Sequence, residues 1–335
     1  MRLTRHGLSG APRSRHRPVR TIASVPPTIA FLGPEGTFAH QALRTLDRAA
    51  DATLLPLTNV TLAIDAVRDG SADAAFVPLE NSVEGAVPAT LDELANGAPL
   101  VIAAEVYLSV AFELLARPGT IIGTVKTVAT HPHAEAQVRR WLIDNLPQAR
   151  VALVGSTAGA AAAVAAGEYD AAVAAAVAGE LNGLKALAHD IADSAGAVTR
   201  FVLLTRPTPP QPPTGNDRTT LVAYLRENHS GALLEILTEF GNRGINLTRI
   251  ESRPDRSPNG RAGMYCFSID CEGHVRDERV GDALAALHRV CSDVRFLGSY
   301  PRRDGAQGAI PDGRTDHDFT EARDWLARVR EAGTS

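Results

Sequence analysis

The chain has 335 residues, of which 44% are hydrophobic and 21% are charged. These proportions are typical of a folded globular protein and exclude disorder throughout the chain. The formal net charge of −4 gives no general attraction to nucleic acid or to an anionic membrane, so we expect a small-molecule partner. Because the length is roughly twice the 150 residues that serve as a guide for one domain, we expect two folded units.

Residues 1–27 are rich in arginine and contain neither an acidic residue nor a long apolar run. They predict a disordered extension, with an organellar transit peptide as the alternative. The chain has three cysteines, Cys266, Cys271 and Cys291. Their odd number and their spacing argue against a disulfide framework or a zinc site and favour a reducing, cytoplasmic environment.

Short apolar runs alternate with helical patterns between residues 28 and 205, which predicts an α/β domain. The predicted strands are 28–32, 74–79, 100–106, 127–130, 151–155, 171–175 and 201–204, and the predicted helices are 39–48, 61–69, 134–145 and 158–166. The segment 206–217 follows, and its prolines favour an extended linker between domains.

Residues 218–300 predict a second domain in which the elements follow the order βαββαβ. The predicted strands are 219–225, 246–253, 262–270 and 294–299, and the predicted helices are 231–242 and 275–289. This order is typical of a ferredoxin-like fold, an antiparallel sheet with two helices on one face. A tail, 301–335, follows, with a short helix predicted over 319–330.

Two strand-to-helix corners of the first domain carry hydroxyl side chains. Thr37 follows Gly33-Pro-Glu-Gly36, and Ser156 and Thr157 follow a predicted strand and open a helix. Free backbone amides at such helix starts favour anions, although each hydroxyl can equally be a simple N-cap. Two such corners suit a ligand with two carboxylates.

Further polar groups lie between these corners. Glu80, Asn81 and Ser82 directly follow a predicted strand and offer a proton donor, an amide and a hydroxyl, although Asn and Ser are also ordinary turn residues. His131 and His133 precede a helix. Two histidines without a matching pattern of acids or cysteines indicate caps or hydrogen-bond donors rather than a metal site.

Taken in order, these motifs resemble those of the prephenate dehydratase family, and the second domain resembles an ACT domain. The matching motifs are Gly33-Pro-Glu-Gly-Thr-Phe38, Glu80-Asn-Ser82 with Gly85, His131-Pro132, Ser156-Thr-Ala158, Thr199-Arg-Phe201, Gly231-Ala-Leu-Leu234 and Glu251-Ser-Arg-Pro254. The resemblance covers roughly residues 28–300. Two positions depart from the family pattern: His133 stands where a Gln is usual, and Ala197 stands where an Asn is common.

The resemblance implies two α/β lobes, similar to those of periplasmic binding proteins, with the ligand in the cleft between them. It implies that prephenate loses carbon dioxide and water to give phenylpyruvate, a reaction that requires no metal or organic cofactor. The protein must orient the substrate and help the hydroxyl to leave. The substrate contacts implied are Thr37, Ser82, His133, Ser156, Thr157, Arg200 and Phe201.

Within this reaction, Thr199 is expected to contact the departing hydroxyl, with Asn81 beside it. Glu80 is a candidate proton donor if burial raises its pKa, and an ion pair or a cap is the alternative. Arg200 suits a substrate carboxylate through its forked guanidinium. Adjacent residues of a regular strand point to opposite faces, however, so at most one of Thr199 and Arg200 lines the cleft unless the strand bends.

For the second domain, the resemblance implies inhibition by L-phenylalanine at a site between ACT domains of a homodimer or homotetramer. The implied contacts are Gly231, Ala232, Leu233, Leu234, Asn246, Leu247, Glu251, Ser252, Arg253 and Pro254. A fragment that ends near Arg206 is then expected to stay active and to ignore phenylalanine. Two other functions remain open: dehydration of arogenate, which an added acidic contact would favour, and a non-catalytic amino-acid sensor.

Overall fold

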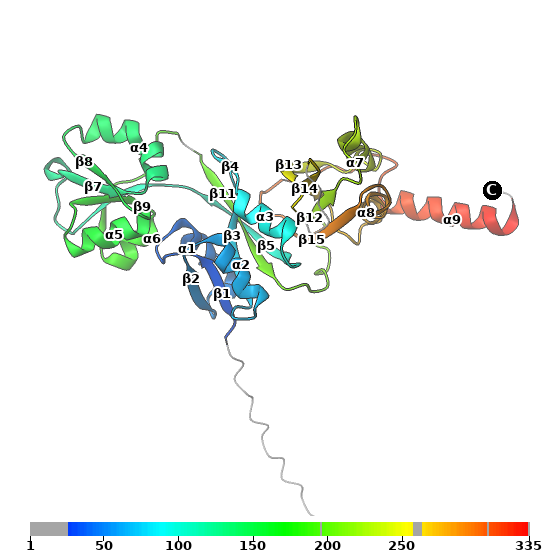
Figure 1. Ribbon diagram of the computed structural model, residues 1–335, viewed down its shortest axis with the longest axis horizontal. Helices are drawn as coiled ribbons and strands as arrows, with labels where there is room; N and C mark the ends of the chain where they lie inside the picture. Colours follow the sequence, from blue (N-terminus) through cyan, green and yellow to red (C-terminus); the bar gives the residue numbers. More distant parts are fainter. Residues whose placement is uncertain (1–25, 195, 257–262, 307, 334–335) are drawn as a thin grey trace, which may run out of the picture.

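The computed structural model of the chain describes residues 26–194, 196–256, 263–306 and 308–333. Most of the predicted N-terminal extension therefore lies outside the described residues. The described part forms three bodies in a row (Figure 1): lobe 2 in green, lobe 1 in blue and cyan, and a C-terminal domain in yellow and orange. No helix among these residues combines the length and the apolar character needed to cross a membrane.

Lobe 1 is built on a six-stranded sheet with the order β2-β1-β3-β11-β5, in which β4 pairs with β3. Strands β1, β2 and β3 are parallel, and β11 returns antiparallel between β3 and β5. The strands are β1 (Thr28–Leu32), β2 (Thr53–Leu57), β3 (Ala74–Asn81), β4 (Gly85–Ala86), β5 (Val101–Ser109) and β11 (Val198–Thr205). The helices are α1 (Phe38–Leu43), α2 (Val60–Arg68) and α3 (Pro88–Asn96), with a 3₁₀ turn at Asp47–Ala49.

Lobe 2 is an insertion between β5 and β11, with a five-stranded sheet of order β10-β6-β9-β7-β8. Its strands are β6 (Glu113–Ala116), β7 (Thr127–Thr130), β8 (Arg150–Leu153), β9 (Ala171–Ala174) and β10 (Lys185–Ala188). Its helices are α4 (Pro132–Asn145), α5 (Thr157–Ala166) and α6 (Ala176–Asn182), with a 3₁₀ turn at Ile122–Thr124. Alanines of α5 and β9 share one buried cluster, so small side chains let this helix pack closely on the sheet.

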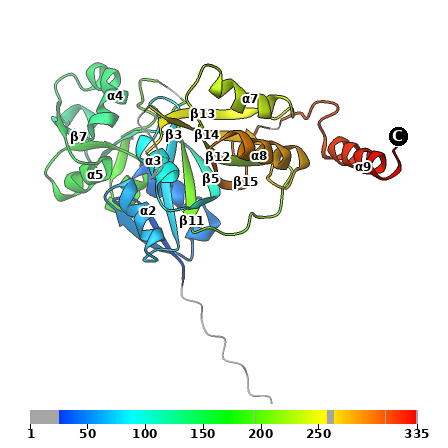
Figure 2. The same ribbon diagram turned by 45° about the vertical axis from the view of Figure 1, so that its right-hand side comes forward.

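The C-terminal domain has the predicted βαββαβ order and an antiparallel sheet of order β13-β14-β12-β15. Its elements are β12 (Asp217–Tyr224), α7 (Ala232–Gly241), β13 (Leu247–Pro254), β14 (Tyr265–Glu272), α8 (Glu278–Val290) and β15 (Asp293–Pro301). Strand β12 begins one residue inside the predicted linker. The tail helix α9 (Asp316–Ala332) is longer than predicted and projects away from the domain (Figure 2).

Strand β12 is buried on both faces, and its side chains alternate between two cores. Leu221 and Ala223 pack with α7 and α8, whereas Val222 and Tyr224 join the core of lobe 1. At Gly298 of β15, with φ of +128°, an added Cβ would lie 2.6 Å from the Ile102 carbonyl oxygen of β5. The C-terminal sheet therefore contacts lobe 1 backbone to backbone, and only glycine fits at that point.

Candidate active site

A cavity of about 390 Å³ opens between the two lobes. Both lobes contribute to its wall, as expected for a cleft between α/β lobes. Lobe 1 and the segment that leaves it after β5 supply Leu32, Gly33, Thr37, Phe38, Ala39, Thr58, Pro78, Asn81, Glu84, Val110, Thr199 and Phe201. Lobe 2 supplies Phe112, His131, His133, Ala134, Gln137, Gly155, Ser156 and Thr157. The predicted site residues Thr37, Asn81, His133, Ser156, Thr157, Thr199 and Phe201 are therefore brought together.

Three helices begin at this cavity. The N-caps are Thr37 for α1, His131 for α4 and Ser156 for α5, and each side chain accepts a backbone amide hydrogen of its own helix. The capping role weighed for Thr37 and Ser156 is thus present, and both residues line the cavity as well. None of the described residues that line it is Lys or Arg, so helix amides and imidazoles are the groups that favour an anion here.

Asn81 and Thr199 form a fixed pair on the wall of lobe 1. The Asn81 amide donates to the Thr199 hydroxyl oxygen over 2.8 Å, while Asn81 Oδ1 accepts from the amides of Val83 at 2.8 Å and Glu84 at 3.1 Å. These contacts fix which way the amide faces. The Thr199 oxygen accepts from Asn81, and a hydroxyl that accepts one hydrogen bond still has its own proton to donate.

Ser82 and Glu80 lie outside the residues that line the cavity. The Ser82 hydroxyl accepts from the Val198 amide over 2.9 Å, so this side chain secures the start of β11, one residue before Thr199. Glu80 is half-buried on β3, next to Ala86 of β4 and opposite Arg200 of β11. The structure thus gives Ser82 a supporting position and places Glu80 outside the cavity wall.

Arg200 does not lie where the sequence predicts a substrate contact. Its side chain is 3% exposed and points away from the cavity, because Thr199 and Arg200 take opposite faces of β11. The guanidinium pairs with Glu105 of β5 at 2.9 Å and with Asp270 of β14. Burial disfavours its charge, but Asp270, Tyr300 and Glu105 hold the pKa of Arg200 well above its ordinary value. Arg200 is occupied by these partners rather than free for a substrate carboxylate.

His133 of lobe 2 faces Glu84 of lobe 1, with 3.1 Å between His133 Nδ1 and Glu84 Oε1. The His133 ring stacks on His131 at a centroid distance of 5.2 Å. Burial, and then the neighbouring His133, lower the pKa of His131 below its usual value, so a neutral imidazole is favoured there. The pair of Glu84 and His133 is a direct polar contact between the two lobes.

Glu84, His131 and Gln137 line the cavity but were absent from the predicted site. Glu84 could have been predicted from the sequence, because it lies between Ser82 and Gly85 in a motif that was already identified. Two aromatic contacts also help to form the wall: Phe201 stacks on Phe76 at 5.3 Å, and Phe38 meets Phe112 of lobe 2 edge-on at 5.1 Å.

A second cavity, also of about 390 Å³, lies in the C-terminal domain. It is lined by Leu225, Asn228, His229, Gly231, Ala232, Leu233, Leu234, Ser252, Tyr265 and Phe267. Five predicted effector residues therefore meet there: Gly231, Ala232, Leu233, Leu234 and Ser252.

The other predicted effector residues, Asn246, Leu247, Glu251, Arg253 and Pro254, do not line this cavity within one chain. Arg253 instead forms an ion pair of 2.7 Å with Asp92 of lobe 1, and the Asn246 amide donates to Glu272 over 3.1 Å. Both contacts occupy side chains that were predicted to bind the effector. Glu251 and Pro254 lie on β13, one of the two edge strands of the sheet.

Sequence comparison identifies both domains. The prephenate dehydratase family matches residues 29–209, and the ACT domain family matches residues 219–289. A protein of Amycolatopsis methanolica named prephenate dehydratase is 55% identical over 303 residues, which cover 90% of this chain and 97% of the relative. A prephenate dehydratase of Mycolicibacterium vanbaalenii is 47% identical, over 91% of this chain and 99% of the relative.

Solved structures extend the comparison. The crystal structure of an Arthrobacter aurescens prephenate dehydratase in complex with L-Phe is 46% identical, has a TM-score of 0.84 and covers 91% of this chain and 100% of its own. GqqA, described as a novel type of quorum quenching acylase, is 34% identical, has a TM-score of 0.73 and covers 83% of this chain and 98% of its own. By its matched domains and its relatives over nearly the whole length, the chain belongs to the prephenate dehydratase family and carries an ACT domain.

Proposed function

We propose that the cavity between the lobes converts prephenate to phenylpyruvate, carbon dioxide and water, as a step of L-phenylalanine biosynthesis. The observation that carries this proposal is the pair of Asn81 and Thr199, held at 2.8 Å beside three helix N-termini. The helix starts suit the carboxylates of prephenate, and the hydroxyl pair suits its departing hydroxyl.

In the proposed reaction the ring carboxylate leaves as carbon dioxide, and the electron pair of the broken bond makes the ring aromatic while the ring hydroxyl departs. The hydroxyl must take up a proton to leave as water. Thr199 would direct its hydroxyl proton at the leaving oxygen, as an oriented donor. His131 and His133 are the titratable groups of lobe 2 on the cavity wall, and the neutral form favoured for His131 suits hydrogen bonding.

The ACT domain supports a second part of the proposal, inhibition by L-phenylalanine at the cavity lined by Gly231, Leu234 and Ser252. The Arthrobacter aurescens relative was solved in complex with L-Phe. We expect a homodimer or homotetramer formed through ACT domains. Strand β13 is an edge of its sheet and offers a partner chain unpaired backbone groups. Glu251 and Pro254 of this strand would then serve an effector held by the partner.

We place the protein in the cytoplasm, where its three buried, free cysteines would stay reduced. Oligomeric state is tested by sedimentation of the full chain at several concentrations, with and without L-phenylalanine. A monomer at every concentration would remove the proposed interface between ACT domains.

Arogenate is the alternative substrate to be tested against prephenate. Glu84 supplies the acidic contact at the cavity that an amino group would need, and arogenate carries such a group where prephenate carries a keto oxygen. The deciding experiment incubates the purified full chain with prephenate and, separately, with arogenate, and measures phenylpyruvate and phenylalanine. Turnover of neither substrate would exclude the dehydratase and favour a non-catalytic amino-acid sensor.

A further inference from the structure

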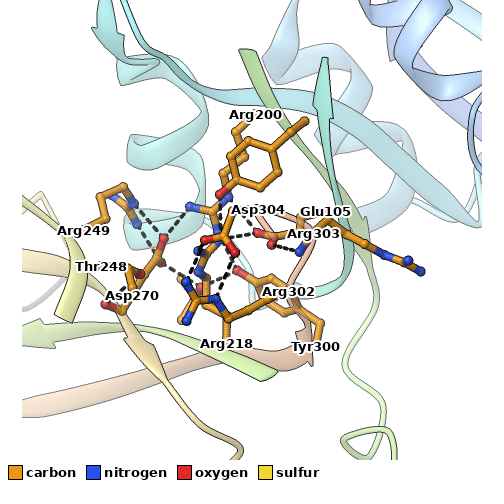
Figure 3. Close-up of polar contacts among 12 residues, drawn as sticks. Glu105, Arg200, Arg218, Thr248, Arg249, Asp270, Tyr300, Arg302, Arg303 and Asp304 are labelled. Atoms are coloured by element: carbon orange, nitrogen blue, oxygen red, sulfur yellow. Dashed lines mark hydrogen bonds and ion pairs between the residues drawn. The ribbon is translucent and has the colours of Figure 1, made fainter. Parts of the chain in front are cut away.

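The face of β11 opposite Thr199 is fastened to the ACT domain. Arg200 Nε donates to Glu105 Oε2 over 2.9 Å within lobe 1. On the ACT side, the guanidinium pairs with Asp270 of β14, and Nη2 donates to the Tyr300 hydroxyl of β15 over 2.9 Å. Figure 3 shows these groups within one cluster of polar contacts between the ribbons of the two domains.

The carboxylates that hold Arg200 are fully buried and have further partners of their own. Asp270 also accepts from Arg249 Nε at 3.0 Å and from the Thr220 hydroxyl at 2.8 Å. Glu105 also pairs with Arg218 and accepts from the Arg303 amide. Removing one member of such a buried set leaves an uncompensated charge, so the set holds its geometry strongly.

The ladder to β5 holds β11 in regular register from Val198 to Leu203, but the ladder on the other side, to β3, is interrupted at this position. Between Arg200 and Phe201 the register of β11 against β3 shifts, and Leu79 of β3 has no counterpart on β11. The shift falls between the two cavity-lining residues of the motif, Thr199 and Phe201. At such an irregularity the direction of a side chain depends on local anchors as well as on the ladder, and Arg200 is anchored by its partners in the ACT domain.

We propose that Arg200 is a positioning residue: pinned by Asp270 and Tyr300 of the ACT domain, it holds β11 so that the Thr199 hydroxyl keeps its place beside Asn81. The inference rests on the proposed role of Thr199 in dehydration. Since Arg200 does not line the cavity, its loss should displace Thr199 without removing a substrate contact. The ACT domain then supports the catalytic strand even when no effector is bound.

The test compares steady-state kinetics of Asp270→Asn with those of the unsubstituted chain. Asp270 lines neither cavity, and the substitution keeps its shape while removing its charge. We expect kcat to fall at least about tenfold, because small displacements of a catalytic group are costly, while KM changes less than about twofold. The matched control is Asp92→Asn, which breaks the ion pair with Arg253 between the same domains without touching β11. Its kcat should stay within about twofold of the parent value.

A second comparison tests whether the effect of Asp270→Asn on kcat acts through Thr199. In the Thr199→Ala background, with residual turnover measured at high enzyme concentration, Asp270→Asn should cause no further loss of kcat. An equal fold loss in both backgrounds would overturn the proposal. If Asp270→Asn does not fold, Tyr300→Phe removes one hydrogen bond to Arg200 and should lower kcat by about threefold.

The outcomes separate the two proposals. If the parent chain turns over prephenate and the folded Asp270 or Tyr300 variant keeps the parent kcat, the inference about Arg200 is wrong and the dehydratase stands. A raised KM at unchanged kcat would also contradict the inference, because it indicates a lost ground-state contact. If the parent chain turns over neither prephenate nor arogenate, the proposed function itself fails.

Discussion

The Asn81 amide and the Thr199 hydroxyl oxygen lie 2.8 Å apart although 118 positions separate them in the sequence. The turn after β3 fixes Asn81, and β11 brings Thr199 to it as the neighbouring strand of the same sheet. The pair therefore depends on the return of the chain from lobe 2 to lobe 1.

The first prediction concerns Thr199. Thr199→Ala should lower kcat by roughly 10² to 10³, the usual loss when an oriented donor to developing charge is removed, with little change in KM. Thr199→Ser keeps the hydroxyl and is the control, which should retain much more turnover. Rapid-mixing or steady-state assays of phenylpyruvate formation measure both, and an unchanged kcat in the alanine variant would exclude Thr199 from the reaction.

The second prediction concerns the acidic side chain at the cavity. Glu84→Gln should lower KM for the prephenate dianion by about two- to fivefold, because a half-exposed carboxylate repels it only modestly. For arogenate, whose amino group would pair with Glu84, the same variant should raise KM. The measurement is the ratio of kcat/KM for the two substrates. Equal ratios in parent and variant would show that Glu84 does not distinguish the keto group of prephenate from the amino group of arogenate.

The third prediction concerns acid stability. Burial lowers the pKa of His40, which the nearby Glu35 only partly offsets, and His40 Nδ1 accepts from the Gly36 amide over 3.0 Å. The folded chain therefore holds His40 neutral, whereas the unfolded chain protonates it near pH 6.5. Its contribution to stability is complete above that pH and is lost as the pH falls toward the lower pKa of the folded state.

Melting temperatures between pH 8 and pH 5 test this sign. The parent chain should lose stability on acidification, and His40→Gln, which keeps an acceptor, should lose less over the same range. His288→Gln replaces an exposed histidine and serves as the matched control. Parallel curves for His40→Gln and the parent chain would contradict the assignment.

The fourth prediction revises the expected behaviour of a fragment that ends near Arg206. Val222, Tyr224, Leu297 and Tyr300 of the ACT domain belong to the same core as the residues of lobe 1 beneath them. Each large side chain exposed by truncation forfeits about 1.5 to 3 kcal/mol of burial. We therefore expect an unstable or aggregating fragment rather than an unregulated enzyme, measured by light scattering and thermal melting. A monodisperse fragment with the parent kcat would contradict this expectation.

The sequence predicted the regular elements best where apolar runs are continuous. Strands β1 and β7 have the predicted bounds, 28–32 and 127–130. The strands β2, β4, β6 and β10 and the helices α3 and α6 were missed, because they are short or flanked by residues of mixed polarity. The order of the C-terminal domain was predicted correctly, since its helices have clear amphipathic patterns.

The site residues could be predicted where a family motif falls at the end of a strand or at the start of a helix, as at Thr37, Asn81 and Ser156. The position of the Arg200 side chain could not be predicted, because its carboxylate partners lie 95 and 70 positions away in the sequence and one of them belongs to another domain. Strand alternation already separated Thr199 from Arg200, yet it could not say which of the two faces the cavity. Only the packing of the ACT sheet on lobe 1 settles that question.

The last prediction concerns the effector cavity. Leu234 is 65% exposed in the single chain yet lines this cavity, so its side chain is available to an apolar ligand. Leu234→Ser should raise the L-phenylalanine concentration for half-inhibition about tenfold, because burial of a leucine against a ligand is worth roughly 1.5 kcal/mol or more. Leu181→Ser replaces a leucine of lobe 2 that is 50% exposed, and inhibition of this control should match the parent.

Calorimetry should show the same loss in phenylalanine affinity for the Leu234 variant. Because allosteric coupling is reciprocal, prephenate should weaken phenylalanine binding by the same factor by which phenylalanine weakens prephenate binding. If Leu234→Ser is inhibited as strongly as the parent chain, phenylalanine acts at another site, and competition with prephenate would then identify the cavity between the lobes as that site.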